Sequence, residues 1–553
     1  MTESNADEHA DEHADAVGVE PIPKRGHPRG LMVLFSAEMW ERFCYYTMRG
    51  LLTLYLTKAL VMGDARAFAI YGAYTALVYA APVIGGRVAD KILGYRRAVI
   101  LGGVMMAIGE FVICFGTQDA MYLGMGVIIV GNGYFKANIS SIVGKLYKDG
   151  DPRRDSGFTI FYMGINLGAV AATLIGAPVG EGLAGTSLGH SGYLVGFALA
   201  GVGMIAGLII FMRGRPHLEG QGEPPDLARL EAPYLMGLSL QTITIVASFA
   251  VIPALYFLIQ YKTIVDGLLL VALAAVVVQL LKAAFRDGDT VQRDRIFVLM
   301  ILMVFNVVFW ACFEQAGSSL TLFADRNVNR SVFGLFEMPA SQTQFFNPAF
   351  IILFGSVFSV MWVRLEERKL NPNIPMKFGL GILQLGLGYL VLYIGATMAG
   401  ADARVPLAIL VLMYLMHTTG ELFLSPIGLS MVTKLAPKDM TGSVMGAWFL
   451  SFAFANSLAA TIAQLTGAEG VGFTQLIDQG EAALRHSGEL HQLVYLGRET
   501  LEPGHLESVA EAAQVSLAGY VDIYTTMGLV TVGIGLLLIA SSGLLNKMMH
   551  GVK

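Results

Sequence analysis

Long hydrophobic segments recur along the whole chain and set its architecture. Each is about 20 residues or longer, the length that an α-helix needs to cross about 30 Å of hydrocarbon. We therefore expect an all-α polytopic membrane protein with both termini on one side, because the number of predicted spans is even. The pattern predicts fourteen transmembrane helices, beginning near Leu31, Ala67, Arg97, Met121, Phe158, Ser191, Leu235, Ile264, Ile296, Thr343, Ile374, Pro406, Thr441 and Ile523.

The composition agrees with a membrane location. Hydrophobic residues make up 55% of the chain and charged residues 14%, and a mean hydropathy of +0.60 is too high for a soluble globular protein. Most of the 37 Lys and Arg residues fall on the side of the termini, so the positive-inside rule places both termini in the cytoplasm. No basic stripe indicates nucleic-acid binding, and the three cysteines follow no disulfide or metal-binding pattern.

Shifts in polarity divide the chain into five parts. We expect a disordered cytoplasmic tail at 1–30, a six-helix bundle at 31–212, a Pro- and Gly-rich cytoplasmic linker at 213–234, an extra transmembrane hairpin at 235–286, and a second six-helix bundle at 287–553. The second bundle contains a polar extracytoplasmic insertion at about 467–520, to which we assign no function. Its segments Phe473–Arg485 and Leu506–Leu517 are predicted to be helical.

A polar stripe on the first predicted span, Leu31–Leu56, is the strongest functional signal. Its members recur at helical spacing on one face and are Glu38, Glu41, Arg42, Tyr45, Tyr46 and Arg49. Charges at this depth are costly, so they normally face a protein interior or a water-filled cavity. The stripe therefore predicts the wall of an ion or substrate path.

Further charges of both signs lie in later spans. Lys136 lies in the first half, and Glu314 and Glu421 lie in the second. A cavity with cations on one wall and carboxylates on the other suits a zwitterion, whose carboxylate would pair with Arg42 and Lys136. In the empty site we expect Lys136 to pair with Glu314 or with a glutamate of the stripe. Glu110, in the third span, receives no role beyond pairing with a polar neighbour.

The loop after the second span has the spacing Gly86-x-x-x-Asp90-Lys91-x-x-Gly94-x-Arg96-Arg97. It resembles the signature loop of the major facilitator superfamily, in which Asp90, Arg96 and Arg97 would form a conformational latch between neighbouring helix ends. Two six-helix halves around a basic linker match the plan of secondary transporters, with the substrate site near the midplane.

Four segments resemble the proton-dependent oligopeptide transporter (POT, or peptide transporter) family, bacterial type. Glu38-x-x-Glu41-Arg42-Phe43-x-Tyr45-Tyr46 is similar to its ExxERF motif, and the other three segments are Gly133–Lys145, Phe161–Ala169 and Gly420–Ser425. The resemblance implies a symporter in the bacterial inner membrane. We expect a monomer, although the sequence leaves the oligomeric state open. It would import di- and tripeptides with protons by alternating access, driven by the proton gradient without a cofactor.

The resemblance also implies roles for individual residues. Arg42 and Lys136 would bind the peptide carboxylate and Glu421 its amino terminus. Proton coupling would involve Glu38, Glu41, Arg42 and Glu314. The peptide backbone and side chains would contact Asn166, Asn347, Tyr45, Tyr46, Tyr79, Trp310, Trp448 and Ser451.

Other functions remain open to different degrees. An enzyme is disfavoured because no nucleophile–base pattern, metal cluster or phosphate loop stands out, and a channel would need no latch. The main alternative is a transporter of the same family for nitrate, an amino acid derivative or a peptide-like drug. Animal members place a histidine on the second helix, whereas Tyr71–Tyr74 contains none. His417, one turn before Glu421, could tune that carboxylate but is more simply a packed histidine.

Overall fold

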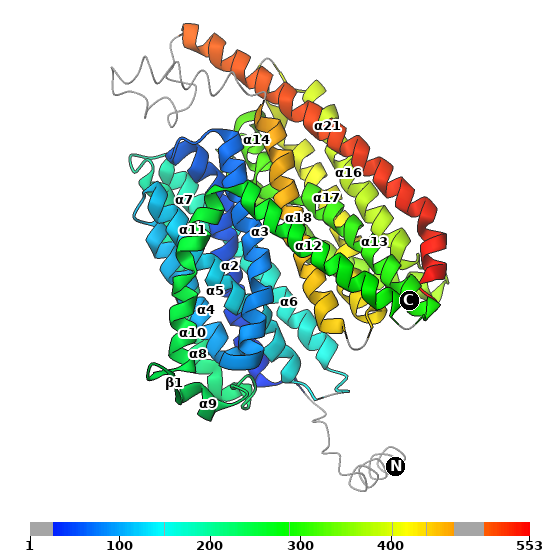
Figure 1. Ribbon diagram of the computed structural model, residues 1–553. Coiled ribbons are helices and arrows are strands. Elements are labelled where there is room, and N and C mark those ends of the chain that lie inside the picture. Colours follow the sequence, from blue (N-terminus) through cyan, green and yellow to red (C-terminus); the bar gives the residue numbers. More distant parts are fainter. Residues whose placement is uncertain are drawn as a thin grey trace, which may run out of the picture.

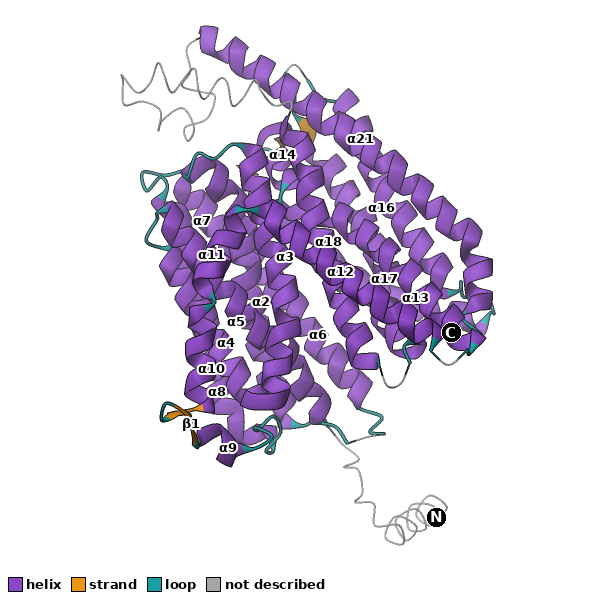
Figure 2. Ribbon diagram, in the orientation of Figure 1, coloured by secondary structure: helices purple, strands orange, loops and turns teal. Residues whose placement is uncertain are grey.

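The computed structural model describes residues 26–148, 150–286, 288–400, 402–437, 440–468 and 503–552. Within them the protein is almost entirely helical, with strands only two or three residues long (Figure 2). The helices between Arg29 and Gly214 pack mainly against one another, and so do those between Thr290 and Met548, whereas those between Leu240 and Phe285 lie along the outside (Figure 1). We call these sets the first helix group, the second helix group and the hairpin.

The first helix group is held together by close helix crossings. At the crossing of α4 and α5, a Cβ on Gly109 would lie 2.7 Å from the carbonyl oxygen of Gly124, so only small residues permit this approach. Three helices continue into short π-helices, η1 (Tyr55–Ala59), η2 (Ala89–Leu93) and η3 (Ala172–Gly176). The α-helices are α2 (Arg29–Leu54), α3 (Asp64–Val88), α4 (Tyr95–Ile113), α5 (Gln118–Lys145), α6 (Arg154–Ala171), α7 (Ala177–Ala184) and α8 (Ser191–Gly214).

The linker forms a short 3₁₀-helix η4 (Arg215–Leu218), helix α9 (Leu227–Glu231) and an antiparallel pair, β1 (Pro233–Leu235) and β2 (Leu238–Ser239). The hairpin follows as α10 (Leu240–Ala250), α11 (Ile252–Gln260) and α12 (Lys262–Phe285). The span expected from Leu235 therefore starts as a strand, and its helix begins five residues later because the Ser239 side chain accepts a hydrogen bond from the backbone N–H of Thr242.

The second helix group contains the remaining long helices. Their connections include 3₁₀-helices η5 (Glu314–Gly317) and η6 (Ala340–Phe345), a parallel pair of β3 (Val328–Asn329) with β6 (Val405–Pro406), and an antiparallel pair of β4 (Ser331–Val332) with β5 (Phe336–Glu337). The α-helices are α13 (Thr290–Phe313), α14 (Ser319–Asn327), α15 (Phe346–Glu367), α16 (Ile374–Thr397), α17 (Leu407–Leu435), α18 (Thr441–Ala468) and α21 (Pro503–Met548).

Helix α21 joins two features that the sequence analysis treats as separate. The predicted helix at Leu506–Leu517 and the last predicted span lie in one continuous helix of 46 residues. The helical prediction for Leu506–Leu517 is therefore confirmed, but this part of the insertion extends a span rather than forming a separate unit. The other predicted helix, Phe473–Arg485, lies outside the described residues.

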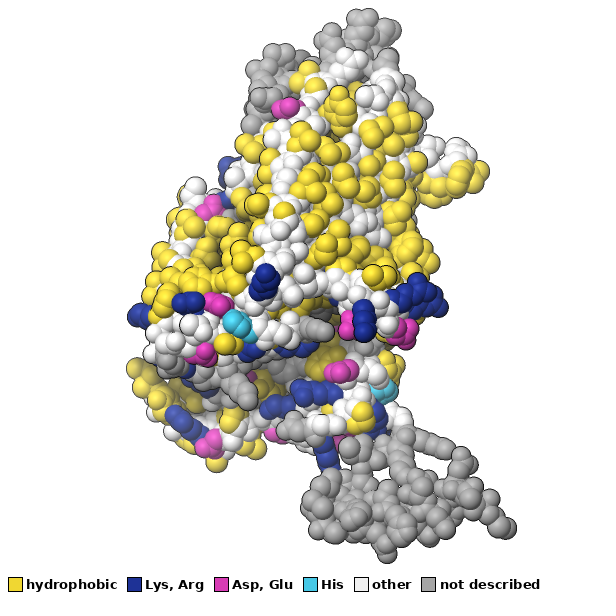
Figure 3. Space-filling view, turned by 90° about the vertical axis from the view of Figure 1, so that its right-hand side faces the viewer, with side chains coloured by type: hydrophobic (Ala, Val, Ile, Leu, Met, Phe, Trp, Pro, Cys, Tyr) yellow, Lys and Arg dark blue, Asp and Glu magenta, His cyan; other side chains and the backbone are white. Residues whose placement is uncertain are grey.

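Long apolar helices confirm a multi-pass membrane protein. Among the described residues, eleven helices are long and apolar enough to cross a membrane. Helices α2, α4 and α5 are 26, 19 and 28 residues long but contain charged side chains, including Glu38, Glu110 and Lys136, and fall outside this set. The count of fourteen spans stays a prediction. Figure 3 shows a broad hydrophobic band, with charged side chains gathered at the end where the surface is hollowed.

The two helix groups meet most closely where α3 packs against α18. A Cβ on Gly72 of α3 would lie 2.1 Å from the Cβ of Ala460 on α18, so this glycine is required for the contact. We call the side on which α2 begins and α21 ends the terminal side, and the opposite side the far side. The contact lies toward the far side, because Gly72 is in the first third of α3, which starts there after η1.

Candidate substrate site

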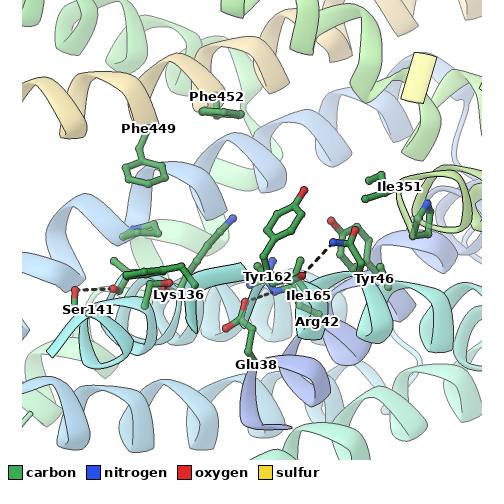
Figure 4. Close-up of a pocket in the computed structure, with 18 of the residues that line it drawn as sticks. Glu38, Arg42, Tyr46, Lys136, Ser141, Tyr162, Ile165, Ile351, Phe449 and Phe452 are labelled. Carbon is green, nitrogen blue, oxygen red and sulfur yellow. Dashed lines mark hydrogen bonds and ion pairs between the residues drawn. The ribbon is translucent and has the colours of Figure 1, made fainter. Parts of the chain in front are cut away.

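A cavity of about 1470 Å³ lies between the two helix groups. Its lining extends to terminal-side residues such as His27, Lys145 and Arg153, so the cavity reaches that side. Figure 4 shows Phe449 and Phe452 of α18 facing Glu38, Arg42 and Lys136. The predicted site residues that line the cavity are Glu38, Arg42, Tyr46, Tyr79, Lys136, Asn166, Trp310, Glu314, Asn347 and Glu421.

Besides the three latch residues, four predicted site residues are not among the lining residues. Glu41 and Tyr45 of α2 are buried within the first helix group, since the adjacent residues Arg42 and Tyr46 occupy the cavity-facing positions. Trp448 is 2% exposed and packs near Gly428. The Ser451 hydroxyl donates to the Trp448 carbonyl at 2.6 Å. Helical spacing alone could not separate cavity-facing from buried positions on these helices.

Arg42 is held by the two glutamates of its own helix. Its Nε lies 2.5 Å from Glu41 Oε2 and 3.1 Å from Glu38 Oε1, and Asn132 Nδ2 donates to Glu41 Oε1 at 3.3 Å. Arg42 Nη2 and Glu38 Oε2 are buried without a hydrogen-bond partner in the described part of the chain. The guanidinium is therefore fixed at one nitrogen, and its side chain lines the cavity.

Lys136 does not use the partners expected from the sequence. Across the described ranges it forms no ion pair within 4.0 Å, and its Nζ lies 4.0 Å from the centroid of the Tyr79 ring. The predicted pairing with Glu314 is wrong, because Arg49 occupies that carboxylate. An aromatic face stabilises a desolvated cation by about 2 kcal/mol, and Lys136 lines the cavity beside this ring.

The pair of Arg49 and Glu314 connects the two helix groups. Arg49 Nη2 donates to Glu314 Oε2 at 2.6 Å and Arg49 Nε donates to the Tyr71 hydroxyl at 2.9 Å. Both charged side chains are less than a tenth exposed. Arg49 belongs to the stripe but was predicted to have no role of its own, although its position one heptad after Arg42 was the available signal.

Further ion pairs close the far side. Lys58 bonds Asp325 at 2.6 Å, and Arg326 bonds Asp64 through two nitrogens at 2.6 and 2.9 Å. Burial of Asp325 would raise its pKa, but the positive charges of Lys58 and Arg330 outweigh it and lower the pKa below the usual 3.8. The sequence analysis missed these pairs because such residues lie near span ends, where charges are common.

The second helix group presents a carboxylate. Asn347 Nδ2 donates to Glu421 Oε2 at 3.0 Å and to the Thr418 hydroxyl at 3.1 Å. Within the described residues no cation lies within salt-bridge distance of Glu421. Neighbouring Trp310 also lines the cavity, and its indole Nε1 has no partner in that same part of the chain. This wall therefore offers an acceptor for a cation.

Two of the three predicted latch residues contact the linker. The Tyr95 hydroxyl donates to Asp90 at 2.6 Å, within the same loop. Arg96 bonds Glu223 at 2.6 Å, and Arg97 bonds Glu231 at 2.8 Å. Arg97 also contacts Gln241 near the start of α10. Arg96 therefore binds the linker, Arg97 binds the linker and the start of α10, and Asp90 accepts from Tyr95, so the latch role of these three residues stays a prediction.

Glu110 and His417, for which the sequence indicates no definite role, are both buried among polar and aromatic neighbours. Cys44 Sγ donates to Glu110 Oε1 at 3.5 Å, which confirms a polar neighbour for this glutamate. His417 lines the cavity, with its ring centroid 4.5 Å from that of Tyr389. No ion pair or hydrogen bond to Glu421 is present for His417 in the described chain.

Comparison with known proteins now identifies the family. The profile of the POT family matches residues 96–475. The chain belongs to the POT family. This confirms the resemblance of its motifs and places it among transporters rather than enzymes.

Individual POT proteins match over most of the chain. "Uncharacterized transporter YclF" of Bacillus subtilis is 37% identical over 81% of this chain and 90% of its own. "Dipeptide and tripeptide permease A" of Edwardsiella piscicida is 32% identical over 95% and 96%. A crystal structure of a mutant peptide transporter POT in complex with alafosfalin has a TM-score of 0.73 and 32% identity, covering 96% of this chain and 98% of that one. The similarity extends over the whole transporter and supports a major facilitator fold.

Proposed function

We propose that this POT protein is a proton-coupled symporter that imports di- and tripeptides across the bacterial inner membrane. The observation that supports it most is the division of charge across the cavity. Arg42 and Lys136 lie on the first helix group, and Glu421, without a cation in the described chain, lies on the second. A short peptide has a carboxylate and an ammonium at opposite ends, so it can join both walls.

The contacts of the empty site suggest an assignment for each peptide group. Arg42 and the ammonium of Lys136 would bind the carboxylate, and Glu421 would bind the amino terminus. Asn166 and Asn347 line the cavity between these charges and would bond the peptide backbone. Tyr46, Tyr79 and Trp310 would contact the side chains.

Alternating access follows from the asymmetry of the two sides. The far side is closed by ion pairs between the helix groups, whereas the cavity reaches the terminal side. The positive-inside rule assigns the terminal side to the cytoplasm, so we infer a state open to the cytoplasm. Opening the far side requires the pairs of Arg49 with Glu314 and of Lys58 with Asp325 to break.

Protonation supplies a reason for these pairs to break. A proton on Glu314 removes the charge that holds Arg49, and a proton on Glu38 or Glu41 weakens the hold on Arg42. Each proton entering the cell gains about 2.3 kcal/mol per 100 mV of membrane potential. Protonation thus changes the ion pairs of Arg42 and Arg49 on α2, and these pairs link proton entry to which side of the cavity is open.

The test is uptake of labelled dialanine into proteoliposomes with an inward proton gradient. Accumulation that collapses when an uncoupler is added supports peptide–proton symport. If folded protein accumulates no dialanine although the gradient is intact, the result contradicts peptide–proton symport. It then favours transport of nitrate, an amino acid derivative or a peptide-like drug. That alternative stays in view because the 37% identical relative is described only as an uncharacterized transporter.

Replacing Asp325 with Asn is expected to favour opening of the far side. The wild-type carboxylate keeps its charge above its ordinary pKa of 3.8 and loses it only as the pH falls through the lowered value. The far-side pair of the wild type should therefore persist from pH 7.5 to 5, whereas D325N lacks it at every pH. The measurement is labelling of a cysteine at the cavity residue Ala316 by an impermeant thiol reagent added from the far side.

The control variant is Asp289→Asn, whose carboxylate caps α13 near the terminal side. We expect about threefold faster labelling in D325N and no change in D289N. Equal labelling rates in D325N and the wild type would contradict a role for Asp325 in closing the far side.

A further inference from the structure

The hairpin contacts both helix groups. Its first part is fastened to the first group, where the Tyr134 and Ser248 hydroxyls lie 2.8 Å apart and the Tyr256 hydroxyl donates to Asp119 at 2.6 Å. Helix α12 then runs obliquely across α3 and α18 toward α13 (Figure 1). At its end, Gln292 Nε2 of the second group donates to the Ala283 carbonyl at 2.8 Å. The hairpin thus crosses the boundary between the two groups.

A polar cluster fixes the far-side end of α12 on α18. Lys262 Nζ lies 2.7 Å from Asp266 Oδ2 and donates to the Thr461 hydroxyl at 2.9 Å. The Ser457 hydroxyl contacts Asp266 Oδ1. Lys262 is only 8% exposed. Each charge therefore has a hydroxyl partner on α18, and both partners would be lost if α12 left this helix.

The contact of α12 with α3 is chemically different. Val265 and Leu269 of α12 share one buried apolar cluster with Ala73 and Ala76 of α3 and Ala453 of α18. Lipid chains are as apolar as these side chains, so they can replace the α12–α3 contact at small cost. They cannot replace hydrogen bonds from charged groups.

Opening of the far side would separate α3 from α18, because these helices touch there at Gly72 and Ala460. Helix α12 covers that contact and must then release one of the two. We propose that Lys262, Asp266, Ser457 and Thr461 position α12 so that it stays on α18 and releases α3. Helices α10 and α11 stay on the first helix group. This inference rests on the alternating access proposed above.

The structure also has a place for the required bend. Tyr261 is the single residue between α11 and α12, and its backbone angles, φ −120° and ψ 73°, are not helical. Its side chain is 54% exposed. Rotation at this residue lets α12 follow the second group while α11 remains in place.

Two cross-links that share one position test the proposal. After replacement of the three native cysteines, Leu269→Cys is combined either with Ala453→Cys on α18 or with Ala76→Cys on α3, and each pair is joined by a short bifunctional thiol reagent. The α18 link should retain at least half of the dialanine uptake. The α3 link should reduce uptake at least tenfold. Equal inhibition by both links, or stronger inhibition by the α18 link, would overturn the proposal.

A distance measurement separates this inference from the transport function. Spin labels at Leu268 on α12, Arg66 on α3 and Leu465 on α18 occupy exposed positions. The distances are measured across pH 5 to 8, with and without dialanine. The distribution of Leu268–Arg66 distances should gain a population at longer distance, whereas the Leu268–Leu465 distance should stay fixed. Two constant distances, or movement relative to α18, overturn the inference. Failure of the unlinked protein to take up dialanine counts instead against peptide transport.

A variant of the polar cluster completes the design. Ser457→Ala with Thr461→Val should broaden the Leu268–Leu465 distance, because α12 loses both of its hydroxyl partners on α18. Ser443→Ala, at an exposed position of the same helix, is the matched control and should leave the distance unchanged. An unchanged distribution in the double variant would show that the cluster does not hold α12.

Discussion

Replacing Glu421 with Gln is expected to weaken dialanine binding about 30-fold or more. Removing one partner of a buried charge pair costs about 2 kcal/mol or more, and about 1.4 kcal/mol corresponds to a factor of ten. Gln keeps the size of the side chain and an oxygen to accept the bond from Asn347, which is 3.0 Å in the wild type. The loss therefore reports the negative charge. Calorimetric titration of purified protein measures it.

A second ligand and a control variant test whether the loss of affinity reflects the contact between Glu421 and the peptide ammonium. N-acetyl-dialanine lacks the ammonium, so E421Q and the wild type should bind it with similar affinity. Glu366→Gln, at an exposed position of α15, is the control and should bind dialanine normally. If E421Q bound dialanine as tightly as the wild type, Glu421 would not be the site for the amino terminus.

Replacing Glu314 with Gln is expected to abolish proton-driven accumulation while leaving exchange intact. Arg49 and Glu314 join the two helix groups at 2.6 Å, with both side chains almost fully buried. Gln can still accept a hydrogen bond from Arg49, but it cannot bind and release a proton. Without that step the membrane potential, about 2.3 kcal/mol per 100 mV for each proton, is no longer coupled to the peptide.

The two transport modes give separate readings. Under an inward proton gradient, accumulation by E314Q should fall about tenfold or more relative to the wild type, which corresponds to about 1.4 kcal/mol of lost driving force. Counterflow of labelled against unlabelled dialanine should stay within about threefold, or about 0.7 kcal/mol. Glu367→Gln, at an exposed position, should accumulate peptide normally. Undiminished accumulation by E314Q would remove Glu314 from proton coupling.

The hydrophobic pattern located the helices well. In lipid each span must satisfy its backbone hydrogen bonds internally, so a long apolar segment has to form a helix. Errors occurred at span ends: the Ser239 cap starts α10 after a short strand, and α21 begins at Pro503, well before the span expected from Ile523. Helices α2, α4 and α5 fall outside the eleven helices that are long and apolar enough to cross a membrane. Their charged residues make a membrane helix resemble a polar one when the surrounding protein is unknown.

Some features of the candidate site were predictable from the sequence, and others were not. Periodicity and family motifs placed Arg42, Lys136 and Glu421 at a cavity, and the structure puts all three in one lining. The same reasoning did not find that Tyr45 is buried, or that Arg49 rather than Lys136 pairs with Glu314. These outcomes depend on helix rotation and on partners far apart in the chain.

The sequence by itself determined a helical membrane transporter of the POT family, because hydrophobic length, buried charge and motif spacing are local properties of the chain. The tertiary structure alone decided which charges pair across the two helix groups, which side of the cavity is closed, and that α12 crosses the boundary between the groups. Such contacts join residues hundreds of positions apart, so their geometry is set only when the helices pack.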